Sequence, residues 1–275
     1  MKINKFIFLS IILGFSCGLF AQTQTQNGVW SLPEYYWESQ SPIQPLPTQN
    51  PNIGYDGLPA SNVSNAMQDA NGDLLFFIVD DEIYDKEGYT IGIFDAAPNY
   101  PPFEVKGTSE ISIVPVPGNC SQFYIFLSGR KNYTGMFSKK PAVALLDMSQ
   151  VNTLGLNPGK MGNLLYCRDV QSVLPSNVPD ITTFDDKQGG SYFAASKEYD
   201  GKRFVFISAS ERIYRFIIDI NGFQYDGFIP VTFFTGDKTL SYRGEMELIE
   251  VDNNDIKYRL DFSFYKSSQC QIHHS

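Results

Sequence analysis

The amino-acid sequence predicts an all-β fold, a β-propeller-like array of four-stranded antiparallel blades whose last set is incomplete. Short β-prone runs follow one another from residue 65 onward, turn signals separate them, and no convincing amphipathic helix appears. The runs group into sets of about four that recur roughly every 45 to 60 residues, which is typical of propeller blades. The central runs are apolar throughout, so we expect strands covered on both faces, and this favours a propeller over the alternative β-sandwich.

Residues 1–21 have the pattern of a secretory signal peptide. Lys2 and Lys5 give a positive start, an apolar run follows, and Ala21 precedes a polar stretch. The apolar run is shorter than the ~20 residues that span a bilayer. We therefore expect cleavage after Ala21 and an exported chain with no membrane span, located in the periplasm, at the cell surface or outside the cell. Acylation of Cys17 is the alternative.

Residues 22–60 are rich in proline, glutamine, asparagine and aromatic residues. Because the prolines should break regular elements, we expect an extended strap. Trp30, Tyr36 and Trp37 are the candidate ligand-binding residues, since flat aromatic rings stack on sugars. Docking of these rings onto the domain is the favoured interpretation, because large aromatic side chains usually bury their area.

Residues 61–266 are expected to form the propeller-like domain. The first strands, 74–79 and 82–85, lie between tight turns at 69–73 and 86–88. The further strands expected, in order, are 111–116, 123–127, 142–146, 164–166, 192–195, 204–207, 213–220, 223–225, 246–250 and 256–264. A short helical turn is expected within residues 149–159, and residues 267–275 form a polar C-terminal tail.

Several of these segments resemble blades of propeller-like domains in large secreted and surface proteins of Bacteroidetes. The similar segments are Asn65 to Phe77, Ile83 to Gly88, Ser112 to Phe126, Ala144 to Met148 and Arg243 to Leu248. The resemblance covers about residues 30–260 and rests on turns and strands, so it implies a fold and no site. Such proteins are often cargo of the type IX secretion system, and residues 267–275 do not resemble their sorting domain.

The charge of the chain limits its partners. The formal net charge is −9, and removal of Lys2 and Lys5 with the signal peptide leaves −11, with no compact basic run. Nucleic acid and anionic lipid are poor partners for such a surface. We expect a protein or glycan partner at the cell surface. The incomplete last set also predicts exposed strand edges and self-association.

Three cysteines remain after processing, and Cys120 with Cys167 is the disulfide pair that we would test first. Unpaired, partly buried thiols are the alternative. The only histidines, His273 and His274, lie at the C-terminal end, where chains tend to be disordered. This argues against a Ser/His/Asp triad, a Cys/His pair or a histidine metal site within the domain.

Carboxylates are the remaining source of catalysis. A glycosidase needs two acids about 5 to 9.5 Å apart. The pool for such a pair is Asp80, Asp81, Glu82, Asp185, Asp186, Glu245 and Glu247. Residues 69–73 alternate oxygen-bearing side chains as calcium loops do, but a hairpin turn is preferred because the closing glutamate is missing. We expect no cofactor, no metal and no catalytic residue.

The leading interpretation is an exported, non-enzymatic binding or scaffold module. A carbohydrate-active hydrolase that uses a carboxylate pair is one alternative. A truncated fragment of a larger surface protein is the other. An open acidic cleft would favour the enzyme, whereas a flat aromatic face would favour binding.

Overall fold

The structure is a computed structural model, and it is all-β as predicted. It describes residues 29–32, 35–38, 43–101, 104–105, 110–133, 136–153, 157–181, 183–184, 191–209, 212–230, 244–250, 258–264 and 270–273. These residues contain strands and two short 3-10 turns, η1 (Phe94–Ala96) and η2 (Val170–Val173), but no α-helix. None of their helical turns is long and apolar enough to cross a membrane. The expected signal peptide lies outside the described residues.

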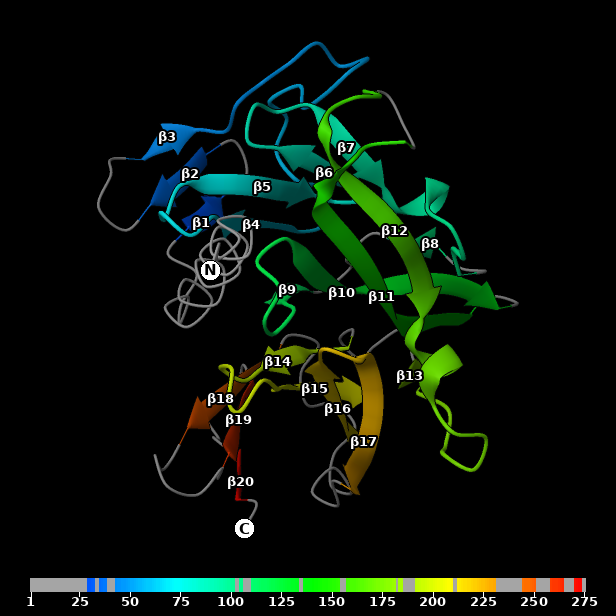
Figure 1. Ribbon diagram of the computed structural model, residues 1–275. Helices are drawn as coiled ribbons and strands as arrows, with labels where there is room; N and C mark the ends of the chain where they lie inside the picture. Colours follow the sequence, from blue (N-terminus) through cyan, green and yellow to red (C-terminus); the bar gives the residue numbers. More distant parts are fainter. Residues whose placement is uncertain are drawn as a thin grey trace, which may run out of the picture.

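The strands form five antiparallel sheets that follow one another along the chain (Figure 1). The first sheet contains β1 (Val29–Leu32), β2 (Tyr35–Glu38) and β3 (Gln44–Pro45), and the second contains β4 (Ser64–Gln68), β5 (Leu74–Val79), β6 (Glu82–Asp85) and β7 (Thr90–Ile93). The third contains β8 (Glu104–Val105), β9 (Ile111–Pro115), β10 (Gln122–Tyr133), β11 (Met136–Val151), β12 (Met161–Asp169) and β13 (Thr183–Phe184). The fourth contains β14 (Phe193–Ala195), β15 (Arg203–Ala209), β16 (Arg212–Asp219) and β17 (Gly222–Pro230), and the fifth contains β18 (Gly244–Glu250), β19 (Tyr258–Phe264) and β20 (Cys270–His273).

The sheets are arranged in series, and each contacts the next through the strands named here. Strand β4 contacts β1 on one side and β9 on the other, and β14 contacts β9 and β18. This order gives the array its propeller-like character, because each sheet is a unit of nearby strands placed beside the next unit. Among the described strands, no hydrogen-bonded ladder joins the first sheet to the last.

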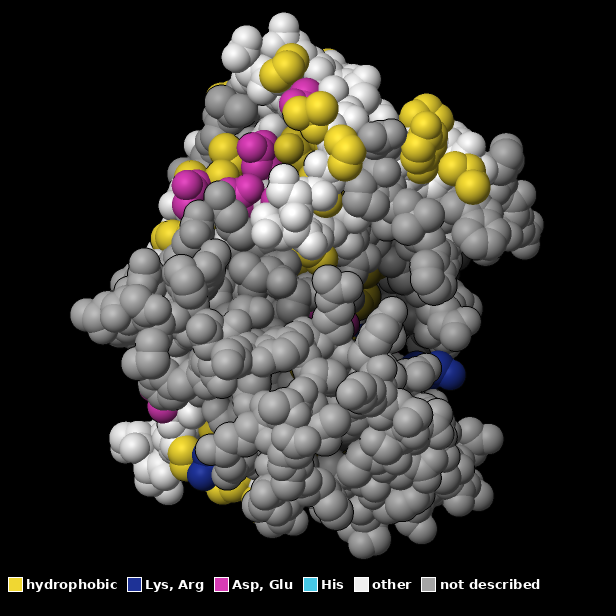
Figure 2. Space-filling model, turned by 180° about the vertical axis from the view of Figure 1, so that it is seen from behind, with side chains coloured by type: hydrophobic (Ala, Val, Ile, Leu, Met, Phe, Trp, Pro, Cys, Tyr) yellow, Lys and Arg dark blue, Asp and Glu magenta, His cyan; other side chains and the backbone are white. Residues whose placement is uncertain are grey.

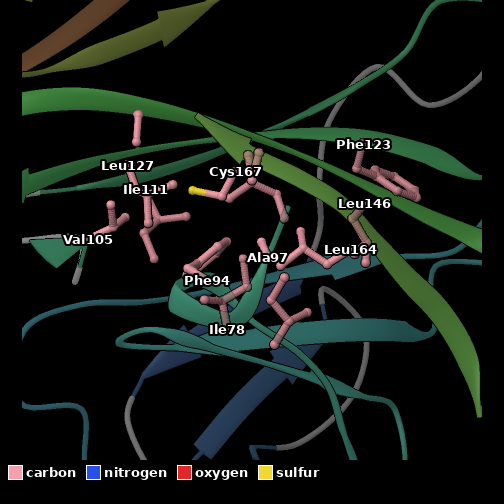
Figure 3. Packing of buried hydrophobic residues seen from close by; sticks show 14 of the residues in the cluster. Ile78, Phe94, Ala97, Val105, Ile111, Phe123, Leu127, Leu146, Leu164 and Cys167 are labelled. Atoms are coloured by element: carbon pink, nitrogen blue, oxygen red, sulfur yellow. The ribbon is translucent and has the colours of Figure 1, made fainter. Parts of the chain in front are cut away.

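Two hydrophobic cores separate the second, third and fourth sheets, and β10 contributes to both. Phe123 faces the core shared with the second sheet (Figure 3). Its ring centroid lies 5.2 Å from that of Phe76. Phe126 faces the core shared with the fourth sheet, 5.3 Å from Phe223. Successive residues of a strand point to opposite faces. The apolar run in β10 is therefore buried on both sides, as predicted.

A recurring turn closes several hairpins. The Asp69 Oδ1 atom accepts the backbone N–H groups of Asn71 and Asp73 at 2.8 and 3.1 Å. Asp85 Oδ1 accepts two N–H groups in the same way, each at 2.9 Å. The glycine that follows each aspartate by three residues has a positive φ, 91° at Gly72, which favours glycine. The turns predicted at 69–73 and 86–88 are confirmed. The Asp69 carboxylate accepts hydrogen bonds from backbone N–H groups of its own turn.

The first sheet was not expected, because prolines were taken to exclude regular elements between residues 22 and 60. The structure forms β1, β2 and β3 there. Pro45 lies in β3, the edge strand of this sheet, where its missing N–H group breaks no inner ladder. Proline therefore limits the length of the strands without preventing the sheet.

Two further expectations are wrong at the described positions. Residues 149–151 continue strand β11 instead of starting a helical turn. Residues 270–273 form β20, which pairs with β19, instead of a tail. His273 is consequently a backbone partner of Arg259. In both cases pairing with a neighbouring strand satisfies the backbone, a tertiary effect that local composition does not reveal.

The last sheet places most of its apolar positions on one face and most of its polar positions on the other, with Ile249 and Glu250 as exceptions. By register, Met246, Leu248, Leu260, Phe262 and Ile272 occupy one face, and Glu245, Glu247, Arg259, Asp261 and His273 occupy the other. This pattern is typical of a sheet with one covered face and one solvated face.

Candidate aromatic binding face

The register of the first sheet separates the three aromatic residues that the sequence singles out. Trp30 pairs with Trp37, and Leu32 pairs with Tyr35. Residues paired across an antiparallel ladder share a face, and neighbours along a strand alternate. The positions of Trp30, Leu32, Tyr35 and Trp37 therefore belong to one face, whereas Tyr36 belongs to the other.

The Tyr36 face is docked. Tyr36 is half-buried and packs against the cluster that contains Leu46, Tyr55 and Phe77. Its hydroxyl donates to Gln44 Oε1 at 3.1 Å. The structure thus places Tyr36 between the first and second sheets, in the docked position that we favoured for all three aromatic residues.

The opposite face carries exposed apolar groups. Tyr35 is 46% exposed and Ile43, one residue before β3, is 65% exposed. Pro45, the register partner of Tyr35, is also exposed. We call the positions of Trp30, Leu32, Tyr35, Trp37, Ile43 and Pro45 the aromatic face. The side chains of Trp30, Leu32 and Trp37 lie outside the described part, so their place rests on the backbone register. Contiguous exposed apolar groups typically mark binding sites.

The sequence segment that forms the first sheet and most of the second is one-sided in charge. Residues 6–85, which supply the first sheet and most of the second, contain no lysine or arginine. The same stretch contains nine acidic residues: Glu34, Glu38, Asp56, Asp69, Asp73, Asp80, Asp81, Glu82 and Asp85. Figure 2 shows most of the visible acidic side chains among hydrophobic ones in the upper left of the view, while described lysine and arginine side chains appear lower down.

Three acids from the predicted carboxylate pool meet in the β5–β6 turn. The Asp80 carboxylate accepts the backbone N–H groups of residues 61, 62 and 63 at 2.9, 2.7 and 3.1 Å. Burial raises the pKa of the Glu82 carboxyl, and the charges of Asp81 and Asp56 raise it further. The Tyr84 hydroxyl donates to Glu82 at 3.1 Å, which opposes these effects. The surroundings of Glu82 thus raise its proton affinity.

The side chains of the rest of the pool are outside the described part of the structure. Asp185 and Asp186 lie outside the described residues. Glu245 and Glu247 are in β18 of the fifth sheet, and only their backbone is described.

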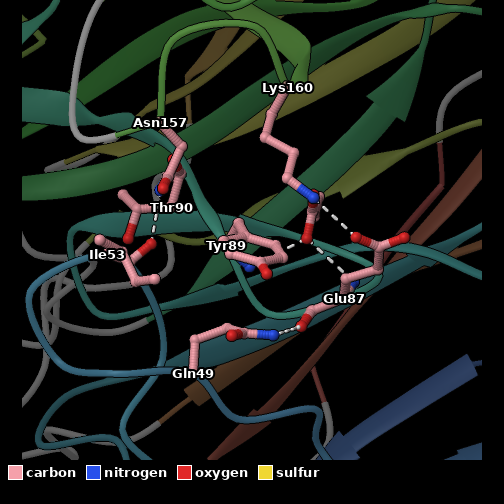
Figure 4. Close-up of polar contacts among 8 residues, drawn as sticks. Gln49, Ile53, Glu87, Tyr89, Thr90, Asn157 and Lys160 are labelled. Carbon is pink, nitrogen blue, oxygen red and sulfur yellow. Dashed lines mark hydrogen bonds and ion pairs between the residues drawn. The ribbon is translucent and has the colours of Figure 1, made fainter.

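Polar contacts pin the segment after β3 to the second and third sheets (Figure 4). The Asn157 side-chain amide, from the loop between β11 and β12, donates to the carbonyl oxygens of Ile53 and Thr90, the latter at 3.0 Å. One side chain therefore joins three segments that are distant in the sequence.

A charged pair lies beside Asn157. Lys160 Nζ lies 2.7 Å from Glu87 Oε2 and 3.6 Å from the centroid of the Tyr89 ring. The Gln49 side chain donates to the carbonyl oxygen of Glu87 at 2.9 Å. We call Gln49, Glu87, Asn157 and Lys160 the latch. It holds the connection that leads from the first sheet into the second.

Two polar side chains that sequence reasoning missed also connect neighbouring sheets. The Asn65 amide on β4 donates to the carbonyl oxygen of Ile111 on β9 at 2.7 Å. The backbone N–H group of Phe193 on β14 donates to Glu110 at 3.1 Å. No local signal in the sequence indicates these contacts, because each joins residues from different sheets.

Cys120 and Cys167, the candidate disulfide pair of the sequence analysis, are not bonded to each other. Cys167 pairs with Ala144, which pairs with Ile125, so these three residues lie level across the third sheet. Cys120 precedes β10 and therefore lies at least three residues, or about 10 Å, from this level along the strand direction. Two strand spacings of about 4.8 Å also separate β10 from β12, which carries Cys167. A disulfide requires Cα atoms within about 7 Å. Cys167 is instead a buried free thiol, and burial raises its pKa to about 12.

Comparisons with known protein families, with curated proteins and with solved structures find no match for this chain. Within the described ranges, no three histidine, cysteine or acidic residues are grouped as metal ligands. The functional argument therefore rests on the geometry and charge of the site itself.

Proposed function

We propose that this protein is an exported, non-enzymatic binding module of the cell surface, and that the aromatic face is its contact surface. The observation that carries the proposal is the split of the first sheet into a docked face, with Tyr36, and an exposed face, with Tyr35 and Ile43. An exposed face that keeps large apolar groups in water is typical of a surface that a partner covers.

The segment that follows the first sheet is held firmly against the second sheet, which supports this role. The latch and the cluster around Tyr55 and Phe77 fix the segment from residue 46 to residue 60 against the second sheet. A contact face on such a support changes little when a partner binds, which lowers the entropic cost of association. The resemblance to surface propellers of Bacteroidetes agrees with a location outside the cytoplasm.

The test is retention of the mature chain, residues 22–275, on envelope fragments of the producing cell. The wild type should be retained. The double variant Tyr35→Ala/Ile43→Ser should lose most of the retention, because it removes exposed apolar contacts without opening a core. Ile220→Ser is the matched control, since Ile220 is 78% exposed in the turn between β16 and β17. Equal retention of the wild type and the double variant would contradict the proposal.

A hydrolase remains the second candidate because of one observation, the raised pKa of Glu82 beside Asp81 and Asp56. A raised pKa favours the protonated carboxyl that a general acid needs. Release of reducing ends from a panel of polysaccharides by the wild type, and its loss in Glu82→Gln, would support this candidate. No release by either protein would exclude it for that panel.

A further inference from the structure

We propose that Arg168 forms a second binding site, which takes the carboxylate group of a small, singly charged ligand such as an acidic monosaccharide. Arg168 and Tyr166 lie on β12, Tyr124 lies on β10, and Phe223 follows the turn between β16 and β17. The site is therefore at the junction of the third and fourth sheets. It shares no residue with the aromatic face, so the inference does not depend on the proposed function.

Arg168 differs from the other described arginines because its guanidinium has no polar partner. The structure describes four arginine side chains, and three of them have one: Arg203 with Glu198, Arg212 with Tyr214, and Arg215 with Asp226. Arg168 forms no hydrogen bond or ion pair with the residues that the structure describes. Its guanidinium is thus available to an external partner.

The guanidinium is held in place but only partly hydrated. Arg168 is half-buried, and its Nε atom is covered and has no hydrogen-bond acceptor in the described part of the structure. The carbon of the guanidinium lies 4.8 Å from the centroid of the Tyr166 ring, a cation–π contact that fixes its position. The two terminal nitrogens also lack a partner, but they are not covered, so they face solvent. A partly desolvated cation with no nearby counter-charge gains more from an anion than a fully hydrated cation does.

Two tyrosine hydroxyls belong to the same cluster. Tyr124 and Tyr166 both pair with Leu145, and their hydroxyl groups form a hydrogen bond with each other. The Tyr124 hydroxyl also accepts the backbone N–H group of Phe223. Burial raises the pKa of Tyr124, so this hydroxyl stays protonated and can donate to Tyr166, while the charge of Arg168 acts on the pKa in the opposite direction. The half-buried Tyr166 then keeps its own O–H group for a ligand.

These groups match a carboxylate better than other anions. The planar guanidinium offers two parallel N–H groups, which fit the two oxygens of a carboxylate. The Tyr166 hydroxyl adds a neutral donor that suits a hydroxyl oxygen of a sugar. The net charge of the chain is −9, and −11 without Lys2 and Lys5, so ligands with several negative charges are repelled over a longer range. A small monocarboxylate keeps the local attraction and minimises this repulsion.

The experiment is an NMR titration of the mature chain with sodium glucuronate that follows the arginine Nε–H resonances. The Nε–H group of Arg168 is covered and therefore exchanges slowly with water, so its resonance is observable, and Arg168→Lys assigns it by its loss. We expect this resonance to shift in a saturable way. Glucose and sodium phosphate are the neutral and the multiply charged comparison ligands, and both should bind more weakly than glucuronate.

Three variants separate the proposed contacts from the fold, with affinities measured by saturation-transfer NMR on the ligand. Arg168→Gln should weaken glucuronate binding about ten- to hundredfold, the range of a charge-assisted hydrogen bond. Tyr166→Phe keeps the ring and removes the hydroxyl, so we expect a loss of about two- to tenfold. Arg212→Gln is the matched control and should bind as the wild type does, because Arg212 is also half-buried and lies 5.7 Å from the centroid of the Phe228 ring.

Acetate as a further ligand shows how much of the ligand is recognised. Binding of acetate as tight as that of glucuronate would support a site for the carboxylate alone, and weaker binding would support contacts to the sugar hydroxyls as well. The absence of a saturable shift of the Arg168 resonance in the wild type would overturn the inference, and this result needs no variant that binds or folds differently. Equal losses in Arg168→Gln and Arg212→Gln, or tighter binding of phosphate than of glucuronate, would overturn it too.

Discussion

Replacing Phe76 by alanine tests the two-sided core of the array. Phe76 lies in the middle of β5, is completely buried and contacts the Phe123 ring edge to face at 5.2 Å. Loss of a buried phenylalanine removes transfer free energy and leaves a cavity, together about 3 to 5 kcal/mol. We place the expected loss in this range because sheets on both sides of the cluster hold the cavity open. Urea denaturation of the mature chain measures the free energy of unfolding directly.

Phe228→Ala is the matched control for this change. Phe228 is 41% exposed in β17, and Arg212 lies over its ring at 5.7 Å. Because a large part of its surface stays in water, its removal should cost less than about 1 kcal/mol. A loss below about 1 kcal/mol for Phe76→Ala, or equal losses for both variants, would refute the burial argument.

Three further predictions concern single groups. Asn157→Ala should destabilise the protein by about 1 to 3 kcal/mol because it removes two hydrogen bonds of the latch. Asn221 is exposed, so Asn221→Ala should leave the stability unchanged, and thermal unfolding compares the two variants. Because the pKa of Glu82 is raised in the folded protein, its contribution to stability is present below pH 4.5 and is lost as the pH rises through the folded pKa. Glu82→Gln should abolish this part of the pH dependence in urea titrations, and an unchanged profile would contradict it. Cys167 should resist alkylation at pH 8 in the native protein and react after unfolding, as peptide mass spectrometry can show, because its thiol is buried with a pKa of about 12.

The fold was more predictable from the sequence than the site. The apolar runs at 74–79 and 123–127 predicted strands buried on both faces, because few other elements bury every residue of a short segment. Strands β1 to β3 were missed because prolines such as Pro45 were read as breakers, although an edge strand tolerates proline. The separation of Tyr36 from Trp37 could have been predicted from the alternation of side chains along a strand.

Other features depend on contacts that no local pattern records. Cys120 and Cys167 do not form the candidate disulfide because the register of β10, β11 and β12 sets them apart. The Asn65 contact to Ile111 joins residues 46 positions apart. Such contacts are determined by how sheets pack, and packing follows from the whole chain.

Hydroxyl-radical footprinting of the mature chain, with and without envelope fragments of the producing cell, tests the central claim most directly. If the aromatic face is the contact surface, Tyr35 and Ile43 become protected on binding, while the somewhat more exposed Tyr199 and Ile220 react as before. Protection at Tyr199 or Ile220 with no change at Tyr35 and Ile43 would contradict the account.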